Sequence, residues 1–426
     1  MDLLVIIVFL LTIFVIFALA IRKPYVSIGR HHLETYAVAA LIGPVLLFIA
    51  GYVHLKDLGH LFAGSTNPMT ILVLFLSMVF ISVYLDNVGF MEYCAKLALR
   101  MAKGSGKRLF FSLYAVVSFL TIFTSNDIII LTLTPFIFYF ARHAGLDPKP
   151  YLIAEFFAAN TWSILLQIGN PTNIYITTSF GLGFMEYLKV MLLPTFVAGL
   201  LNLALLYLIF MNHINTRFTP EKVNPSDALH DKPGAVIGLA LLLACIVALS
   251  LSPYFEIPLW QVAFGSAIIL LVIIMLRDGF STINHVLHKM PWSVIPFVFS
   301  FFVMVEVLSR EGFISALGAF LQGTGIGDIF SFGISSALLS NVLNNIPMTV
   351  AYSSLSESLG SIYATVIGSN IGAYFTPLGA LAGIMWMSIL KHKRVELSYH
   401  EFIGYGVLIG SIVLIGALDA LSISLR

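Results

Sequence analysis

The sequence predicts an all-α membrane protein: an inverted repeat of five transmembrane helices each, with two re-entrant helical hairpins and two broken helices. The chain has 426 residues, of which 59% are hydrophobic and 10% charged, whereas soluble domains carry about 25% charged residues. Its apolar stretches are too continuous for the alternating strands of a membrane barrel. Short segments rich in Asn interrupt these stretches at corresponding places in both halves.

The first half, 1–210, contains five stretches that are long enough to cross a bilayer, which takes about 20 apolar residues. We expect these spans at about 2–21, 33–54, 69–86, 150–180 and 184–210. The first span resembles a signal peptide, but Asp2 precedes it and positive charges follow it. It is therefore expected to be a retained helix that starts outside.

A polar linker at 211–233 separates the halves and is expected in the cytoplasm. The second half, 234–426, repeats the order of elements. We expect its spans at about 234–252, 257–276, 291–308, 361–390 and 400–425.

Each half has one further apolar region that does not fit a single span. The region at about 108–141 is interrupted by Asn-Asp at 126–127, and that at about 328–354 by Asn-Asn at 344–345. Each arm is shorter than the roughly 20 residues needed to cross. A re-entrant hairpin that enters, turns at the Asn tip and leaves on the same side fits both regions.

The basic residues agree with this topology. If the N-terminus faces out, only Lys56, Lys189, Arg310 and Arg426 of the 22 Lys and Arg residues fall in outside segments. This is the bias of the positive-inside rule. Because each half crosses five times, the second half enters with the opposite orientation. We therefore expect a multi-pass protein of the cell (inner) membrane with both termini outside.

Asp127 is the main candidate for proton coupling. It lies at the first tip, and desolvation at that depth disfavours the carboxylate. Such a carboxyl group can be protonated and neutral when one transported species is bound, and ionised when another is bound. The structural alternative is an N-cap for a helix beginning at Ile128, since Asp is a favoured capping residue.

Amides and hydroxyls at the tips and breaks are candidate substrate ligands. Pro and Gly at 169–173 and 368–379 are expected to break the fourth and ninth spans and to free backbone carbonyls. The alternatives are local hydrogen bonding at the tips and simple proline kinks. The candidate substrate-binding residues are Ser125, Asn126, Asn170, Thr172, Asn173, Asn344, Asn345, Ser369, Asn370 and Thr376.

Two further acids, Glu155 and Glu306, are weaker candidates for coupling. Glu155 is expected near the cytoplasmic end of its helix, facing the headgroups, and Glu306 near the outer end of the eighth span. The two cysteines are too far apart in sequence for a thiol metal site. Neither a metal, a cofactor, a nucleic-acid partner nor enzymatic activity is expected. The segment 104–108 lacks the Ser or Thr of a phosphate-binding loop, so energy must come from an ion gradient or a separate ATPase subunit.

At these motifs the chain resembles, nearly end to end, the arsenite efflux permeases, the arsenical pump membrane proteins of the wider ion transporter superfamily. The resemblance in the first half is carried by Leu85-Asp86 with Gly89-Phe90, Asn126-Asp127 with Leu131 to Pro135, and Gly181 to Phe184 with Glu186-Tyr187. In the second half it is carried by Asn344 to Pro347 and by the stretch from Ile367-Gly368 through Thr376 to Gly379, together with Trp386. It implies export of arsenite or antimonite in exchange for protons, and association with a soluble arsenic-stimulated ATPase. The segment 169–173 is closer to sodium-coupled and anion-transporting relatives.

The hypothesis from the sequence is therefore a proton-coupled exporter of arsenite or antimonite that works by alternating access. Arsenite is largely an uncharged trihydroxide at neutral pH, and amides and hydroxyls can bind its three hydroxyl groups. The alternatives are a sodium/proton antiporter or a dicarboxylate or other anion transporter of the same superfamily. A channel is a further alternative, although an inverted repeat with broken helices favours a carrier.

Overall fold

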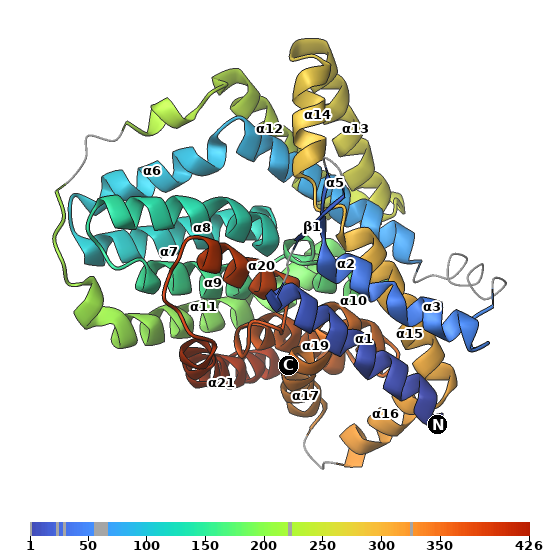
Figure 1. Ribbon diagram of the computed structural model, residues 1–426. Helices are drawn as coiled ribbons and strands as arrows, with labels where there is room; N and C mark the ends of the chain where they lie inside the picture. Colours follow the sequence, from blue (N-terminus) through green and yellow to red (C-terminus); the bar gives the residue numbers. More distant parts are fainter. Residues whose placement is uncertain (1, 23–24, 29–30, 55–66, 220–223, 324–326) are drawn as a thin grey trace.

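The structure is a computed structural model that describes residues 2–22, 25–28, 31–54, 67–219, 224–323 and 327–426. Nearly all of these residues are helical, and the all-α fold class is confirmed (Figure 1). The described part also contains one short antiparallel hairpin, β1 (Tyr25–Ile28) and β2 (His31–Glu34), ahead of the second helix. Within the predicted linker, 220–223 lie outside the described residues.

The helices of the first half follow the predicted order of elements. They are α1 (Leu3–Arg22), α2 (Thr35–Ala40), α3 (Ile42–Ile49), α5 (Pro68–Asn87), α6 (Phe90–Ala102), α7 (Gly106–Phe123), α8 (Asn126–His143), α9 (Lys149–Trp162), η1 (Gln167–Gly169), α10 (Pro171–Ser179) and α11 (Phe184–Ile214).

The second half follows after η2 (Pro225–Ala228). Its helices are α12 (Lys232–Leu251), η3 (Ser252–Phe255), α13 (Leu259–Arg277), α14 (Phe280–Lys289), α15 (Val294–Arg310), α16 (Phe313–Gly323), α17 (Asp328–Leu343), α18 (Asn345–Ser353), α19 (Leu359–Ile371), η4 (Gly372–Tyr374), α20 (Leu381–His392) and α21 (Tyr399–Ser424).

Among the described residues, six helical stretches are long and apolar enough to cross a membrane, and α14 with α15, bent by 43°, forms a seventh candidate. The six contain α5, α7, α11, α12, α13 and α21. Large apolar side chains such as Leu208, Val236 and Leu276 are exposed on their outer faces. Acyl chains can cover such faces, so the chain is a multi-pass membrane protein.

The span expected at 33–54 is wrong in its bounds. Its first residues belong to β2. The helix is divided at Leu41 into α2 and α3, and α3 ends at Ile49. Pro44 lies in the first turn of α3 and has no N–H to donate to the carbonyl of Ala40. This missing donor accounts for the interruption.

Both regions that were predicted as hairpins form two helices joined at a polar tip. α7 and α8 meet at 124–125, and α17 and α18 meet at Asn344, whose φ is +75°. The re-entrant insertion of these hairpins and the inverted symmetry of 1–210 and 234–426 remain predictions.

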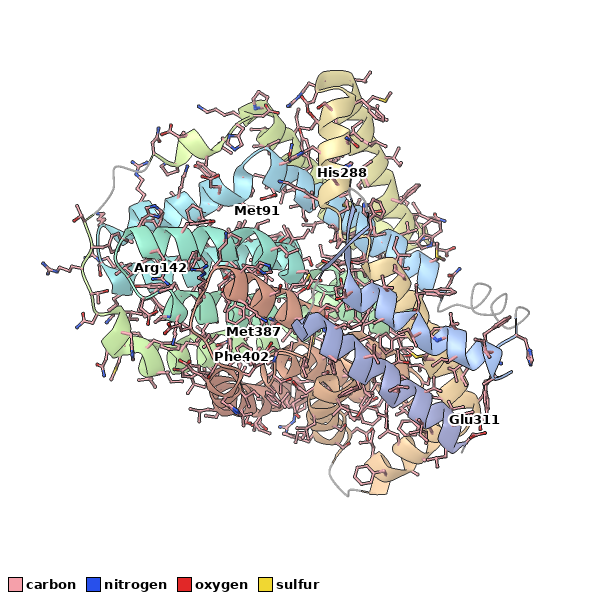
Figure 2. The ribbon with its side chains drawn as sticks, viewed as in Figure 1. Met91, Arg142, His288, Glu311, Met387 and Phe402 are labelled. Atoms are coloured by element: carbon pink, nitrogen blue, oxygen red, sulfur yellow. The ribbon has the colours of Figure 1, made fainter. Side chains whose placement is uncertain are left out.

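The two predicted broken helices run through the interior. α9 and α10 are separated by 163–170, and α19 and α20 by 372–380. Nearly every residue of α9, α10 and α19 is buried. Side chains fill the space between helices, including Met387 of α20 and Phe402 of α21 (Figure 2). The first break is therefore wholly buried, whereas Thr376 and Leu378 of the second break are partly exposed.

Candidate functional site

Asn370, at the end of α19, joins the two broken helices. Its Oδ1 accepts hydrogen bonds from Ser163 Oγ and Asn170 Nδ2, each at 2.9 Å, and its Nδ2 donates to Asn173 Oδ1 at 2.7 Å. Thr172 Oγ1 accepts from Ser369 Oγ at 3.3 Å beside them. All six side chains are buried. We call them the amide cluster: Ser163, Asn170, Thr172, Asn173, Ser369 and Asn370.

The sequence of the first break explains its part of the amide cluster. Asn170 caps α10, its Oδ1 accepting from the backbone N–H of Thr172 at 3.1 Å. Asn173 Nδ2 donates to the carbonyl of Ser163 at 2.8 Å. Ser163 follows the last residue of α9, so its carbonyl lies outside the regular helix. A Cβ at Gly169 would lie 2.3 Å from the same carbonyl. The Gly-Asn-Pro-Thr-Asn segment therefore stabilises a sharp break by its own side chains.

Hydrogen bonds join the second tip to the second break. Asn344 Nδ2 donates to the carbonyl of Leu378 at 3.2 Å, and the backbone N–H of Asn345 donates to the carbonyl of Gly379 at 3.0 Å. Asn341 Oδ1 accepts from both the backbone N–H and the hydroxyl of Thr376, at 2.9 and 2.7 Å. Asn344 also caps α18. Local hydrogen bonding thus accounts for much of this tip.

The first tip approaches the amide cluster through Asn160 of α9. Asn126 Nδ2 donates to Asn160 Oδ1 at 3.1 Å, and Ser163 Oγ donates to the carbonyl of Asn160 at 2.9 Å. Ser125 Oγ and Asn126 Oδ1 are buried without a hydrogen-bond partner in the described structure. Buried polar atoms are usually paired, so these two unpaired atoms are candidates for binding a ligand.

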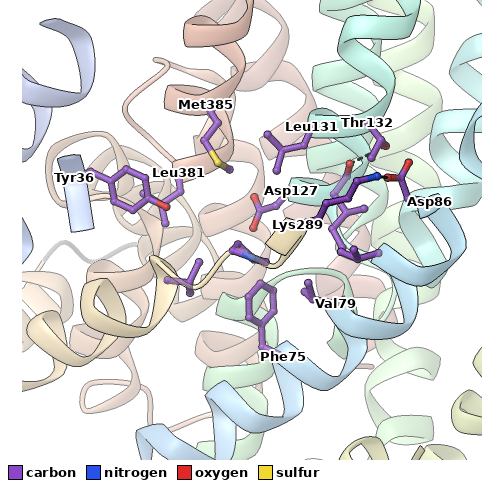
Figure 3. A pocket seen from close by; sticks show the side chains of 14 residues that line it. Tyr36, Phe75, Val79, Asp86, Asp127, Leu131, Thr132, Lys289, Leu381 and Met385 are labelled. Carbon is purple, nitrogen blue, oxygen red and sulfur yellow. Dashed lines mark hydrogen bonds and ion pairs between the residues drawn. The ribbon is translucent and has the colours of Figure 1, made fainter. Parts of the chain in front are cut away.

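Asp127 faces a cavity of about 360 Å³ beside the first tip (Figure 3). Tyr36, Thr132 and Met385 also line it, and an ion pair of 3.1 Å between Lys289 and Asp86 lies at its exposed end. α8 begins at Asn126, and its N-cap makes no side-chain cap bond. Among the described residues, the Asp127 carboxyl has no hydrogen-bond partner, so the capping alternative has no support.

The candidate substrate residues fall into two groups. Asn170, Thr172, Asn173, Ser369 and Asn370 lie in the amide cluster, and Ser125 and Asn126 lie next to it. Asn344, Asn345 and Thr376 lie together at the second tip. In the described part of the chain, no side-chain hydrogen bond joins the two groups directly.

Sequence reasoning missed Ser163, Asn160 and Asn341. Asn160 and Asn341 are amides in apolar helices, and Asn341 precedes Asn344 by one helical turn, which was the available signal. Among the described residues, no cluster of three or more His, Cys, Asp or Glu side chains could hold a metal ion.

The expectation that Glu155 faces the headgroups is wrong. Its side chain is 1% exposed and accepts hydrogen bonds from Thr134 Oγ1 at 2.9 and 3.0 Å. The start of α9 is enclosed by α7, α8 and α11, so its position in the sequence does not place it at the surface. Glu306, by contrast, is half-exposed and forms an ion pair with Arg310 at 3.0 Å.

Two broken helices that meet in a buried polar cluster, within a bundle of apolar helices, are the architecture of a membrane transporter. Residues 17–364 match the model of the citrate transporter family (CitMHS), which covers most of the chain. The chain belongs to this family.

Relatives with similar sequences are named for arsenical transport. The arsenical pump membrane protein of Escherichia coli (strain K12) is 28% identical over 403 residues, covering 91% of this chain and 93% of that protein. The arsenical pump membrane protein of Yersinia enterocolitica has the same identity and coverage. The resemblance to arsenical pump membrane proteins is thereby confirmed.

The fold has a counterpart among solved structures. The YdaH transporter of Alcanivorax borkumensis, described as having an unusual topology, superimposes with a TM-score of 0.56 at 14% identity. The match covers 99% of this chain and 97% of that one. At this identity the likeness concerns the fold alone.

Proposed function

We propose that the chain exports arsenite or antimonite across the cell (inner) membrane in exchange for protons, by alternating access. The observation that carries the proposal is the amide cluster, which joins the two broken helices and adjoins two unpaired polar atoms of the first tip. The names of the relatives supply the arsenical substrate.

The substrate binds between the first tip and the amide cluster. Ser125 Oγ and Asn126 Oδ1 have unused hydrogen-bonding capacity there, and neutral amides and hydroxyls suit an uncharged trihydroxide. The chain's two cysteines, Cys94 and Cys245, are free and lie on different helices, so capture by clustered thiolates has no support. Asn344, Asn345 and Thr376 line the site from the second tip when the halves rearrange.

Asp127 carries the coupling proton. Its carboxyl group faces the cavity rather than a basic partner, so proton uptake from the aqueous side does not require breaking an ion pair. The halves 1–210 and 234–426 insert with opposite orientation, the linker 211–233 lies inside and both termini lie outside. A soluble arsenic-stimulated ATPase binds the cytoplasmic side where such a subunit is present.

A second candidate function is transport of a carboxylate anion, with sodium or protons as the coupling ion. The family description as citrate transporters favours it. Lys289 also lines the cavity, although its ammonium group is paired with Asp86 at 3.1 Å, so an anion would have to displace that carboxylate.

Transport into everted membrane vesicles tests the proposal. We expect arsenite uptake driven by a pH gradient, and Asp127→Asn should reduce that uptake at least tenfold because the amide cannot carry a proton. The exposed linker variant Asp227→Asn is the matched control and should transport normally. Unaltered proton-driven uptake in Asp127→Asn would remove Asp127 from the coupling role.

Competition assays on the same vesicles separate the alternatives. Inhibition of uptake by citrate or succinate would favour the anion carrier. Sodium-dependent proton movement without arsenite would favour a sodium/proton antiporter.

A further inference from the structure

Glu155 is a buried carboxyl group that the proposed mechanism does not use. It lies on α9, and its only hydrogen-bond partner among the described residues is the hydroxyl of Thr134 on α8. Both carboxyl oxygens lie within 3.0 Å of that hydroxyl, which has a single hydrogen. One oxygen of an ionised Glu155 would therefore lack a donor of its own.

The surroundings of Glu155 supply no compensating charge. The titratable side chains around α9 are the buried Tyr114, Tyr187, Tyr363 and Tyr374 of neighbouring elements, the partly buried Asp127 of α8, and Tyr151 of α9 itself. The cations Lys107, Arg142 and Lys391 lie at exposed helix ends. In the described structure none of these groups bonds Glu155. A buried carboxylate without a partner is strongly disfavoured, whereas the protonated carboxyl can donate its hydrogen to Thr134.

Trp386 on α20 supplies a donor that is unused. Its indole Nε1 is buried without a hydrogen-bond partner in the described structure, and its ring lies 4.9 Å from that of Phe156, the neighbour of Glu155. Glu155 therefore lies where the first hairpin, through Thr134, and the second broken helix, through Trp386, meet the first broken helix.

We propose that Glu155 is a second proton-carrying residue, protonated in this conformation and deprotonated when α20 shifts so that the indole N–H of Trp386 donates to its carboxylate. In that step the carboxyl O–H bond breaks, the electron pair stays on the carboxylate and the proton passes to water. The proposal rests on proton coupling in the proposed function, yet the protonation of Glu155 itself can be measured without substrate.

Infrared titration of the purified protein in lipid, with no substrate added, tests the protonation. We expect a protonated-carboxyl band that disappears at high pH in the wild-type protein, is missing in Glu155→Gln and is retained in Glu306→Gln. The Glu306 control removes a half-exposed acid of the same type. A wild-type spectrum identical to that of Glu155→Gln at every pH would overturn the proposal.

Trp386→Phe tests the indole with the ring packing preserved. Because this variant removes the donor for the carboxylate, the pH at which the band disappears should rise by at least one unit. An unchanged midpoint would overturn the role of the indole. Since the carboxyl is intact, this measurement also decides the question if Glu155→Gln does not fold.

Transport then separates this inference from the proposed function. Glu155→Gln keeps an acceptor for Thr134, and we expect arsenite exchange to persist while stimulation by a pH gradient falls at least tenfold. If Asp127→Asn loses that stimulation and Glu155→Gln keeps it, the inference fails and the proposed function stands. If the wild type moves no arsenite, the proposed function fails and the infrared titration still decides the state of Glu155.

Discussion

Asn370 uses both ends of its amide to hold two distant segments together. The oxygen accepts from Ser163 and Asn170, and the nitrogen donates to Asn173 and to the carbonyl of Val366. A neutral amide serves here because it can donate and accept at once without placing a charge in the interior. The same property makes the residue hard to replace.

Asn370→Ala should destabilise the protein by about 2–5 kcal/mol, because each buried group left unpaired costs about 1–3 kcal/mol. Asn170 Nδ2 is left without a partner, and Ser163 Oγ and Asn173 Oδ1 each lose one of their hydrogen bonds. Unfolding of the purified protein followed by tryptophan fluorescence measures the effect. Asn224→Ala, which removes an exposed amide from the linker, is the matched control. An equal unfolding midpoint in both variants would contradict the role of Asn370.

The sequence was informative about single residues where a polar group stands out in an apolar run. Asn126, Asn170 and Asn370 could be selected for that reason, and the structure brings them close together. Glu155 could not be placed, because its depth depends on which helices surround α9. Distance from the end of a span predicts exposure only for helices at the edge of a bundle.

At the scale of elements, α17 packs closely against α19 through glycines. A Cβ at Gly368 would lie 2.0 Å from Ser336 Oγ and 2.4 Å from the carbonyl of Gly333. One turn later, a Cβ at Gly372 would lie 2.6 Å from the carbonyl of Ala337. Small residues four apart permit this approach of two membrane helices. The second hairpin is thereby fixed against the broken helix that carries Asn370.

Gly368→Ala should lower stability by about 1–3 kcal/mol and impair transport, since the added methyl forces α17 away from α19. Gly265→Ala on α13 is the matched control, because a Cβ there meets nothing within 4 Å. Alanine is the better helix former by roughly 0.5–1 kcal/mol, so the control should be neutral or stabilising. Thermal unfolding and vesicle transport of both variants provide the measurement. Equal stability of the two would show that this packing is dispensable.

Elements with a strong sequence signal were predicted within a few residues. The long helices α5, α13 and α21 follow from uninterrupted apolar runs, and the two breaks follow from Gly and Pro beside Asn. The division between α2 and α3 was missed because a proline in the first turn of a helix reads equally well as part of one span. The short β1–β2 pair has no sequence signal that separates it from a polar loop.

At the scale of the whole molecule, the exterior and the interior differ in the kind of surface they present. The outer helices expose Leu208, Val236, Leu276 and Ile423, while the side chains of the amide cluster are buried. Exposed apolar and buried polar side chains are the opposite of the arrangement in a soluble protein. The apolar outer faces suit contact with lipid, and the buried polar groups form a protected site. The surface does not specify which side of the membrane each loop occupies; only the basic residues predict it.

Cysteine labelling tests that predicted orientation in a background with Cys94→Ser and Cys245→Ser. Ser226→Cys, in the linker, should be protected from a membrane-impermeant maleimide in intact cells and labelled after lysis. Tyr254→Cys, at a site that is 81% exposed between α12 and α13, should be labelled in intact cells. The two sites are separated only by α12, so opposite results require that helix to cross the bilayer. Labelling of Ser226→Cys in intact cells would reverse the orientation, and with it the direction in which the hairpins open.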